Sequence, residues 1–184
     1  MSVLGQILRG VHAGEEHLVW NAVDAASAAP IALSSPAFPA GALIPARHAG
    51  AGVGENVSPE LAWSGIPADA RELVVVIEDP DAPLPRPVVH AIAYGISPTA
   101  TSLGDGALSS PRAEGHARGK GFLGRCHYGG PRPIPGHGPH RYVFQLFALR
   151  RPLSFPEAPS RRQLVAQMHG AVLARGRLDG LYER

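Results

Sequence analysis

Cysteine, lysine and long hydrophobic runs are the scarcest features of this 184-residue sequence. The single cysteine, Cys126, excludes an intramolecular disulfide, which fits a reducing compartment. No apolar run approaches the roughly 18 residues that a membrane-spanning helix needs. The first residues lack a charged stretch followed by an apolar core, so no signal peptide is expected. These absences predict a cytoplasmic protein without a membrane span.

The basic residues are almost all arginine and are spread along the chain. Lys120 is the only lysine, and 17 basic residues stand against 15 acidic ones, which gives a net charge of +2. The densest groupings are the pairs Arg150-Arg151 and Arg161-Arg162. Nucleic-acid binding usually requires a clustered basic surface with stacking aromatic side chains, and aromatic residues make up only 6 % here. A nucleic-acid partner is therefore not expected.

Glycine and proline are unusually abundant, with 22 glycines and 19 prolines. Together they form about 22 % of the chain, against roughly 12 % in average proteins. Because both residues disfavour helices, a helical bundle or coiled coil is excluded. A hydrophobic share of 45 % and a small net charge argue equally against disorder. The composition predicts a mainly β domain with many turns.

The two ends of the chain show helical patterns. Leu4, Ile7, Leu8 and Val11 are spaced for one face of an amphipathic helix, so residues 1–20 are expected to form an N-terminal helical extension that docks on the main body. The Ala- and Ser-rich residues 21–30 read as a linker, and residues 31–184 as the domain itself.

The C-terminal stretch also reads as helical. Ser160 and Gln163 match a capping box, and Leu164, Val165, Met168 and Val172 would share a face of the helix that follows.

Between these ends, hydrophobic and β-branched runs predict strands. The run 73–77 is apolar on both faces, as in a buried central strand. The segment 129–139 contains eight glycines and prolines and cannot form a regular element. Residues 98–121 read as a long exposed loop. The predicted strands span residues 31–33, 61–63, 73–77, 88–96 and 140–149.

Polar residues with chemical potential stand at the ends of three of these strands. Side chains two positions apart point the same way in an extended chain, so Asp79 and Asp81 could share a face, as could His140 and Tyr142. His90 begins the next apolar run. If adjacent strands end together, these side chains converge on one site, beside a Gly/Pro loop whose glycine N–H groups could bind an anion.

Simpler interpretations of these residues remain open. Asp-Pro-Asp is a strong turn former, and a lone His90 could be a satisfied structural histidine. His127, His137 and His140 raise the question of zinc, but no further cysteine supports a site, so no metal is expected. The chain has no Gly-x-Ser-x-Gly elbow. We therefore assign no catalytic residue and no cofactor.

Two motifs resemble the signature regions of the phosphatidylethanolamine-binding protein family, in its bacterial branch similar to Raf kinase inhibitory proteins. The first is Asp79-Pro80-Asp81-Ala82-Pro83, followed by His90. The second runs from Tyr128-Gly129-Gly130-Pro131 through Gly136-His137-Gly138-Pro139 to His140-Arg141-Tyr142. Supporting matches are Ser58 to Trp63 and the C-terminal Gly180 to Arg184, so that the resemblance covers roughly residues 30 to 184. Where the family usually has an aromatic residue after the first signature histidine, this chain has Ala91.

The resemblance implies a two-sheet Greek-key β-sandwich with short helices and a small anion-binding pocket. It also makes Asp79–Pro80 and Ala82–Pro83 candidates for cis peptide bonds. Arg132 would add a cation that could bind phosphate with two hydrogen bonds. The implied ligand-binding residues are Asp79, Asp81, His90, Pro131, Arg132, Gly136, His140 and Tyr142.

The expected function is therefore binding of a small phosphorylated or zwitterionic ligand, such as phosphate or phosphoethanolamine. Histidine, tyrosine and loop amides would donate to phosphate, while an aspartate could accept the ammonium group or orient a histidine. Hydrolysis of a small phosphoester by the same carboxylates and histidines is the alternative. The resemblance also allows regulation of a kinase or protease partner, and the oligomeric state is open, with a homodimer among the alternatives.

Overall fold

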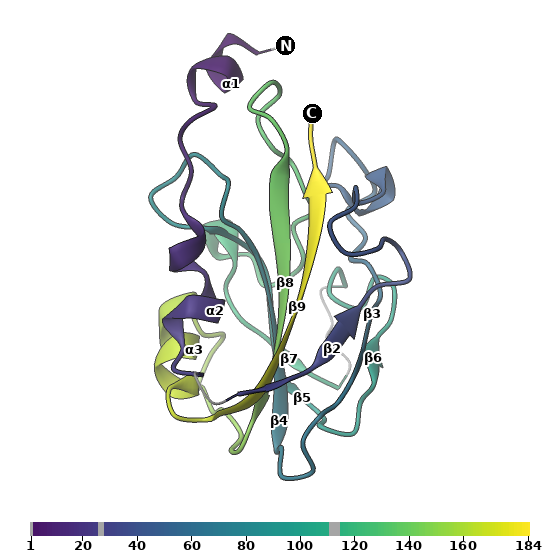
Figure 1. Cartoon of the computed structure of the whole chain (residues 1–184), viewed down its shortest axis with the longest axis vertical. Helices are drawn as coiled ribbons and strands as arrows, with labels where there is room; N and C mark the ends of the chain where they lie inside the picture. Colours follow the sequence, from purple (N-terminus) through teal and green to yellow (C-terminus); the bar gives the residue numbers. More distant parts are fainter. Residues whose placement is uncertain (1, 26–27, 111–114) are drawn as a thin grey trace.

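The computed structural model describes residues 2–25, 28–110 and 115–184. Two β-sheets form the body of the molecule, and short helices cover the outer face of the larger sheet (Figure 1). The larger sheet has the strand order β1-β9-β8-β4-β5-β7, and the smaller has the order β2-β3-β6. The strands of the larger sheet are β1 (Ala29–Pro30), β9 (Val172–Tyr182), β8 (His140–Leu149), β4 (Glu72–Asp79), β5 (Val88–Ile96) and β7 (Ala117–Arg118). Those of the smaller sheet are β2 (Ala32–Ser34), β3 (Leu61–Ser64) and β6 (Ser102–Leu103). The two-sheet β-sandwich expected from the sequence is confirmed.

The helices of the described residues are all short. The α-helices are α1 (Val3–Ile7), α2 (Val19–Ala22) and α3 (Arg161–Met168), and the 3₁₀ helices are η1 (Glu15–His17), η2 (Ala46–His48) and η3 (Phe122–Gly124). At α3 the expected capping box is present: the Ser160 side chain accepts from the Gln163 backbone N–H, and the Gln163 side-chain oxygen accepts from the Ser160 backbone N–H.

Strand β4 has a hydrophobic core on each side, which explains its unbroken apolar sequence. Leu73, Val75 and Ile77 point into the core between the two sheets, where Trp63 and Phe144 also lie. The intervening Val74 and Val76 face a second core under α2 and α3. Successive side chains of a strand alternate between its faces, so a strand covered on both sides must be apolar throughout.

The C-terminal prediction is right for α3 and wrong beyond it. The helix ends at Met168, and Val172 begins β9, an eleven-residue strand between β8 and β1. Buried and half-buried residues alternate along β9, from Val172 through Ala174 and Gly176 to Leu178. This period of two was present in the sequence, but Gly176 and Gly180 weakened it because glycine is a poor strand former.

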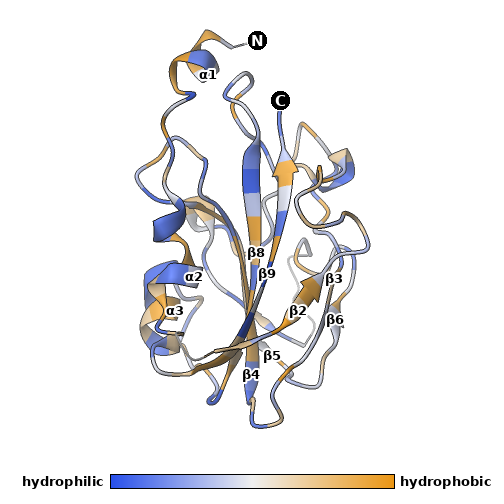
Figure 2. Cartoon of the chain, viewed as in Figure 1, coloured by the Kyte–Doolittle hydropathy of each residue, from blue (hydrophilic) through white to orange (hydrophobic). Residues whose placement is uncertain are grey.

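The N-terminal prediction also needs correction. Helix α1 has only five residues, and Leu4, Ile7 and Val11 of the expected docking stripe are exposed; the segment contacts the body instead through Gly5 and Arg9. Figure 2 shows this helix, which carries hydrophobic and hydrophilic residues, at one end of the molecule. So short a helix cannot present the stripe that the spacing suggested, because nearly two turns are needed to align it. Part of the expected linker is packed instead: Val23 is buried under the large sheet.

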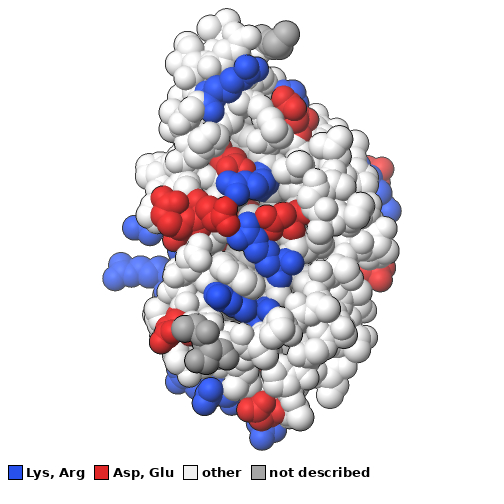
Figure 3. Space-filling model, in the orientation of Figure 1, with Lys and Arg blue, Asp and Glu red and all other residues white. Residues whose placement is uncertain are grey.

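Charged side chains on the face shown in Figure 3 gather in mixed groups rather than in areas of one sign. Glu15 pairs with both Arg141 and Arg177, and Arg177 also pairs with Asp179. On this face the surface therefore lacks the single-sign basic area that nucleic-acid binding requires. Within the described residues, no helix has the length and hydrophobicity to cross a membrane.

Candidate functional site

Strand pairing brings the polar strand ends together. Strand β4 lies between β5 and β8, with Asp79 opposite Val88 on one side and Glu78 opposite Val143 on the other. The first residues of β5 and β8 therefore meet the last residues of β4 at one edge of the sandwich. As the sequence suggested, Asp79, His90, His140 and Tyr142 line one cavity there.

His90 sits at an irregularity in the β4–β5 ladder. Ile77 pairs with Ala91 and Glu78 pairs with Val89, so His90 is an extra residue on β5. Such bulges re-aim side chains. The His90 Nδ1–H donates to the Gly129 carbonyl, and the buried Nε2 has no partner among the described residues. Burial lowers the pKa of His90, an effect that the nearby Asp79 charge opposes, so the ring is neutral at pH 7 with an acceptor at Nε2.

A chain of hydrogen bonds links Asp79, His140 and His137. His140 Nδ1 lies 2.8 Å from Asp79 Oδ2, and its Nε2 lies 2.8 Å from His137 Nδ1. Because a carboxylate only accepts, His140 Nδ1 carries the proton. Both ring nitrogens of His140 are thus occupied within the protein. The expectation that His140 donates directly to a ligand is wrong in this geometry; His140 instead orients the carboxylate and His137.

Asp79 and Asp81 do not share a face, contrary to the expectation from the sequence. The Asp79 Oδ1 accepts the backbone N–H groups of Asp81 and Ala82, at 2.8 and 3.0 Å, which folds the chain into a tight turn. The alternation of an extended strand therefore stops at Asp79. The expected cis bonds at Asp79–Pro80 and Ala82–Pro83 are also wrong, since both are trans. These side chain–backbone bonds form the turn with trans peptides.

Asp81 is bound to Arg141 and takes no part in the cavity. Its carboxylate accepts three hydrogen bonds of 2.8–2.9 Å from the Arg141 backbone N–H, Nε and Nη2. Burial alone would raise the pKa of Asp81, but these bonds and the guanidinium charge together lower it. A carboxyl with a lowered pKa stabilises the fold at neutral pH, and this contribution is lost as the pH falls through the folded-state pKa.

Replacing Asp81 with asparagine is expected to lower the free energy of unfolding by about 2 kcal/mol at pH 7, because charge-assisted hydrogen bonds are lost. As the pH falls below about 4, the ordinary pKa of an aspartate, the wild type progressively loses the same contribution and the difference between the two proteins narrows. Urea unfolding between pH 7 and pH 3 measures both effects. Asp105→Asn, which removes an exposed ion pair to Arg47, is the control and should cost below about 0.5 kcal/mol. A constant difference between Asp81→Asn and wild type across this pH range would contradict the assignment.

The Gly/Pro segment 129–139 forms the opposite wall and is held by side chains from elsewhere. Asn56, which has a positive φ of 58°, donates to the Tyr128 carbonyl and accepts the Gly130 N–H. The Tyr128 hydroxyl donates to the His48 carbonyl at 2.9 Å. The expectation that glycine amides here bind an anion is wrong for Gly129 and Gly130, whose N–H groups are bonded within the protein.

Tyr142 presents a buried hydroxyl to the cavity. Its Oη makes no hydrogen bond of normal geometry to the described residues, although the Arg132 backbone N–H is near enough to moderate its pKa. Burial and the Asp79 charge raise that pKa, so the hydroxyl keeps its proton. The His90 and Tyr142 rings meet edge to face, with centroids 5.0 Å apart. Two buried polar atoms of residues that line the cavity, His90 Nε2 and Tyr142 Oη, thus lack a hydrogen bond of normal geometry to the described residues.

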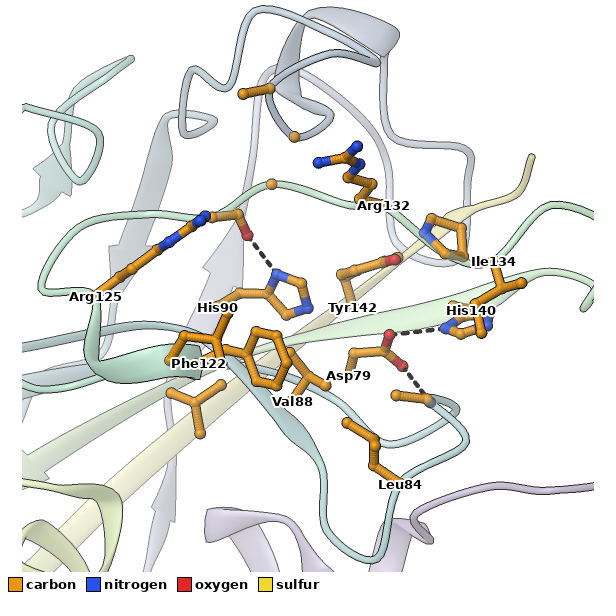
Figure 4. A pocket seen from close by; sticks show the side chains of 18 of the residues that line it. Asp79, Leu84, Val88, His90, Phe122, Arg125, Arg132, Ile134, His140 and Tyr142 are labelled. Atoms are coloured by element: carbon orange, nitrogen blue, oxygen red, sulfur yellow. Dashed lines mark hydrogen bonds and ion pairs between the residues drawn. The ribbon is translucent and has the colours of Figure 1, made fainter. Parts of the chain in front are cut away.

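The cavity has a volume of about 590 Å³ and a mixed lining. Figure 4 shows Asp79, His90 and Tyr142 at its centre, with Arg132 on one side and Val88 and Leu84 on the other. Of the sequence-predicted site residues, the structure places five on the lining: Asp79, His90, Arg132, His140 and Tyr142. It places three elsewhere: Asp81, Pro131 and Gly136.

Pro131 and Gly136 shape the wall through their backbones. The Pro131 carbonyl accepts the Gly50 N–H, and the Gly136 N–H donates to the Arg184 carbonyl. The described residues contain no group of three His, Cys, Asp or Glu side chains arranged to hold a metal ion. Of the histidines that raised the zinc question, His127 and His140 line the cavity, and His140 is bonded to His137.

Sequence reasoning missed several residues of the lining. Asn56 and Arg125 lie in irregular segments with no pattern that marks them. Leu8 was expected to be part of a docking stripe, and it lines the cavity instead. For Asn56, the tolerance of asparagine for positive φ was the one available signal. For Arg125 we find none.

The site is thus a cavity at one end of a two-sheet β-sandwich, lined by polar and apolar side chains. The family profile described as phosphatidylethanolamine-binding protein matches residues 34–183. The chain belongs to this family.

Similar proteins and structures agree with this assignment. An Aquifex aeolicus UPF0098 protein is 36 % identical over 132 residues, 71 % of this chain and 77 % of that protein. A Mycobacterium tuberculosis relative, named as a candidate lipoprotein, LppC, is 38 % identical over 86 % of this chain and 75 % of its own. The crystal structure of Escherichia coli YbcL, titled a member of the mammalian PEBP family, has a TM-score of 0.78 and 26 % identity. It covers 85 % of this chain and 99 % of its own.

Proposed function

We propose that the cavity binds a small phosphorylated zwitterion of the phosphoethanolamine type. The single observation that carries the proposal is a pair of buried atoms beside the Asp79 carboxylate, His90 Nε2 and Tyr142 Oη, which make no hydrogen bond of normal geometry to the described residues. Leaving buried polar groups unpaired is costly, so a ligand that pairs both gains their full hydrogen-bonding energy.

The charges of the cavity suit both ends of such a ligand. The exposed Arg132 guanidinium has no carboxylate within ion-pair distance among the described residues and can contact phosphate. The Tyr142 hydroxyl can donate to a phosphate oxygen. The Asp79 carboxylate can accept from the ammonium group. The proposal thus places the phosphate between His90, Tyr142 and Arg132, and the ammonium group against Asp79.

Because His90 is neutral, phosphate binding requires a proton between His90 Nε2 and the phosphate. Its Nε2 is an acceptor, so a phosphate oxygen can approach only if one proton lies between them, on the ring or on the phosphate. The second pKa of a phosphate monoester is about 6. Phosphoethanolamine should therefore bind more tightly at pH 6 than at pH 8, by about tenfold or more.

Tyr142→Phe is the sharpest variant for isothermal titration with phosphoethanolamine at pH 6. Because the hydroxyl makes no hydrogen bond of normal geometry to the described residues, its removal should leave the melting temperature unchanged or higher. Binding should weaken by about tenfold, through the loss of a hydrogen bond to a charged group. Tyr128→Phe is the matched control, since its hydroxyl bonds the protein: it should lower stability by about 1 kcal/mol and affect binding less. Absence of wild-type binding, or equal affinity of wild type and Tyr142→Phe, would reject the proposal.

Binding without turnover is part of the proposal, and hydrolysis is its alternative. Incubation of the protein with phosphoethanolamine and with an aryl phosphate, followed by measurement of released inorganic phosphate, distinguishes them. Catalytic release that disappears in His90→Ala would favour the hydrolase. Regulation of a kinase or protease, a cytoplasmic location and a homodimer stay predictions.

A further inference from the structure

The N-terminal segment, residues 2–14, lies outside the part of the chain that the family profile matches, yet it contacts both loops of the site. At one end it is fastened to the turn that follows Asp79. The Ala13 N–H donates to the Ala82 carbonyl at 2.9 Å, and the Gly14 N–H donates to the Pro80 carbonyl at 3.0 Å.

The other end of the segment is fastened to the loop before His140. Arg9 Nε donates to the Gly136 carbonyl at 3.1 Å. Gly5 is the buried residue of α1 and packs so closely that a Cβ would lie 2.2 Å from the Pro135 carbonyl oxygen and 2.8 Å from the His137 nitrogen. The segment thus spans the two signature loops, and Leu8, between these contacts, lines the cavity.

Leu8 belongs to the apolar part of the lining. Figure 4 shows Leu84 and Val88 below Asp79 and Phe122 beside it, with Arg132 on the far side of Tyr142. A ligand whose phosphate lies near His90 and Tyr142 would therefore meet polar groups at one end and carbon at the other. The apolar lining residues include Leu8, Pro83, Leu84, Val88, Phe122 and Ile134.

We propose that Leu8 is a specificity-determining residue, which contacts the carbon substituent of a bound phosphomonoester. The inference rests on the proposed function and adds a selection rule to it. Inorganic phosphate fills the polar end alone and is indifferent to the N-terminal segment. A monoester with a short alkyl group also removes apolar surface of Leu8 and its neighbours from water, and binds more tightly for that reason.

The test compares inorganic phosphate with hexyl phosphate by titration calorimetry at pH 6, using the full chain. Leu8→Ala should weaken the binding of hexyl phosphate by about tenfold, because most of the apolar contact with the Leu8 side chain is lost. The affinity for inorganic phosphate should change less than about twofold, since no carbon contact is involved.

A second pair of variants tests the segment without touching the cavity. Gly5→Ala introduces the close contact with Pro135 and should displace the segment, and so reproduce the selective loss for hexyl phosphate. Gly10→Ala is the matched control, since a Cβ there meets nothing within 4 Å, and it should bind as wild type does. Melting temperatures of all variants verify that the sandwich is intact.

The outcomes separate the inference from the function on which it rests. Selective loss in Leu8→Ala and Gly5→Ala, but not in Gly10→Ala, supports the inference. Unchanged affinities, or equal losses for both ligands, overturn it while the phosphate site stands. Failure of wild type to bind either ligand overturns the proposed function and the inference together.

Discussion

Replacing Glu78 with glutamine is expected to lower the free energy of unfolding by about 3 kcal/mol. The substitution removes a buried negative charge and leaves at least one buried donor without an acceptor. The Glu78 side chain has no exposed surface. Its Oε2 accepts the Val19 backbone N–H and Gln145 Nε2, both at 2.8 Å, and its Oε1 accepts Arg161 Nε at 2.5 Å. A glutamine has one acceptor oxygen, so at least one of these donors would meet its NH₂ group instead.

Glu157→Gln is the control for this measurement. It removes the ion pair with Lys120, in which both side chains are exposed, and should cost below about 0.5 kcal/mol. Equilibrium urea unfolding of both variants gives the comparison. A loss below about 1 kcal/mol in Glu78→Gln would mean that these donors are satisfied without the carboxylate, for example by water. The result matters for the site because Glu78 precedes Asp79 and fixes the end of β4.

Replacing Asp79 with asparagine is expected to weaken phosphoethanolamine binding by about a hundredfold. Removing one member of a buried, hydrogen-bonded charge pair costs about 2–5 kcal/mol of binding free energy. Inorganic phosphate has no ammonium group, so its affinity should fall much less, or rise because a negative charge has left the cavity. Titration of the two ligands against wild type and Asp79→Asn measures this split.

The Asp79→Asn variant can keep the turn that follows residue 79. The asparagine oxygen can still accept the Asp81 and Ala82 N–H groups, as Asp79 Oδ1 does. The new NH₂ then faces His140 Nδ1, which must become the acceptor, so that the proton moves to Nε2 and is donated to His137. Nitrogen NMR of the histidine rings reports this change of tautomer. Equal losses for both phosphates would show that Asp79 acts through the structure and not through the ammonium group.

Much of the sandwich could be predicted because its strands carry local patterns. The run around Val75 is apolar because cores lie on both sides of it, and the capping box at Ser160 is a local motif. The strand β9 was missed because Gly176 and Gly180 carry no side chain to mark it. The length of α1 was overestimated, since the spacing of Leu4 and Ile7 cannot show whether a partner surface exists.

The site was predictable where it depends on strand ends and not where it depends on turns. Asp79, His90, His140 and Tyr142 meet because β5, β4 and β8 are neighbours, which the sequence alone allowed but did not require. The direction of Asp81 depends on a turn held by Asp79 Oδ1, a contact that no periodicity encodes. The position of Leu8 depends likewise on contacts with segments distant in the sequence, and the pairing of His137 with His140 depends on an irregular backbone.

A crystal structure grown with phosphoethanolamine at pH 6 tests the central claim most directly. We expect phosphate oxygens within hydrogen-bonding distance, about 3 Å, of His90 Nε2 and Tyr142 Oη, with the ammonium nitrogen against the Asp79 carboxylate. An unoccupied cavity at saturating ligand, or a ligand whose phosphate avoids both His90 and Tyr142, would contradict it.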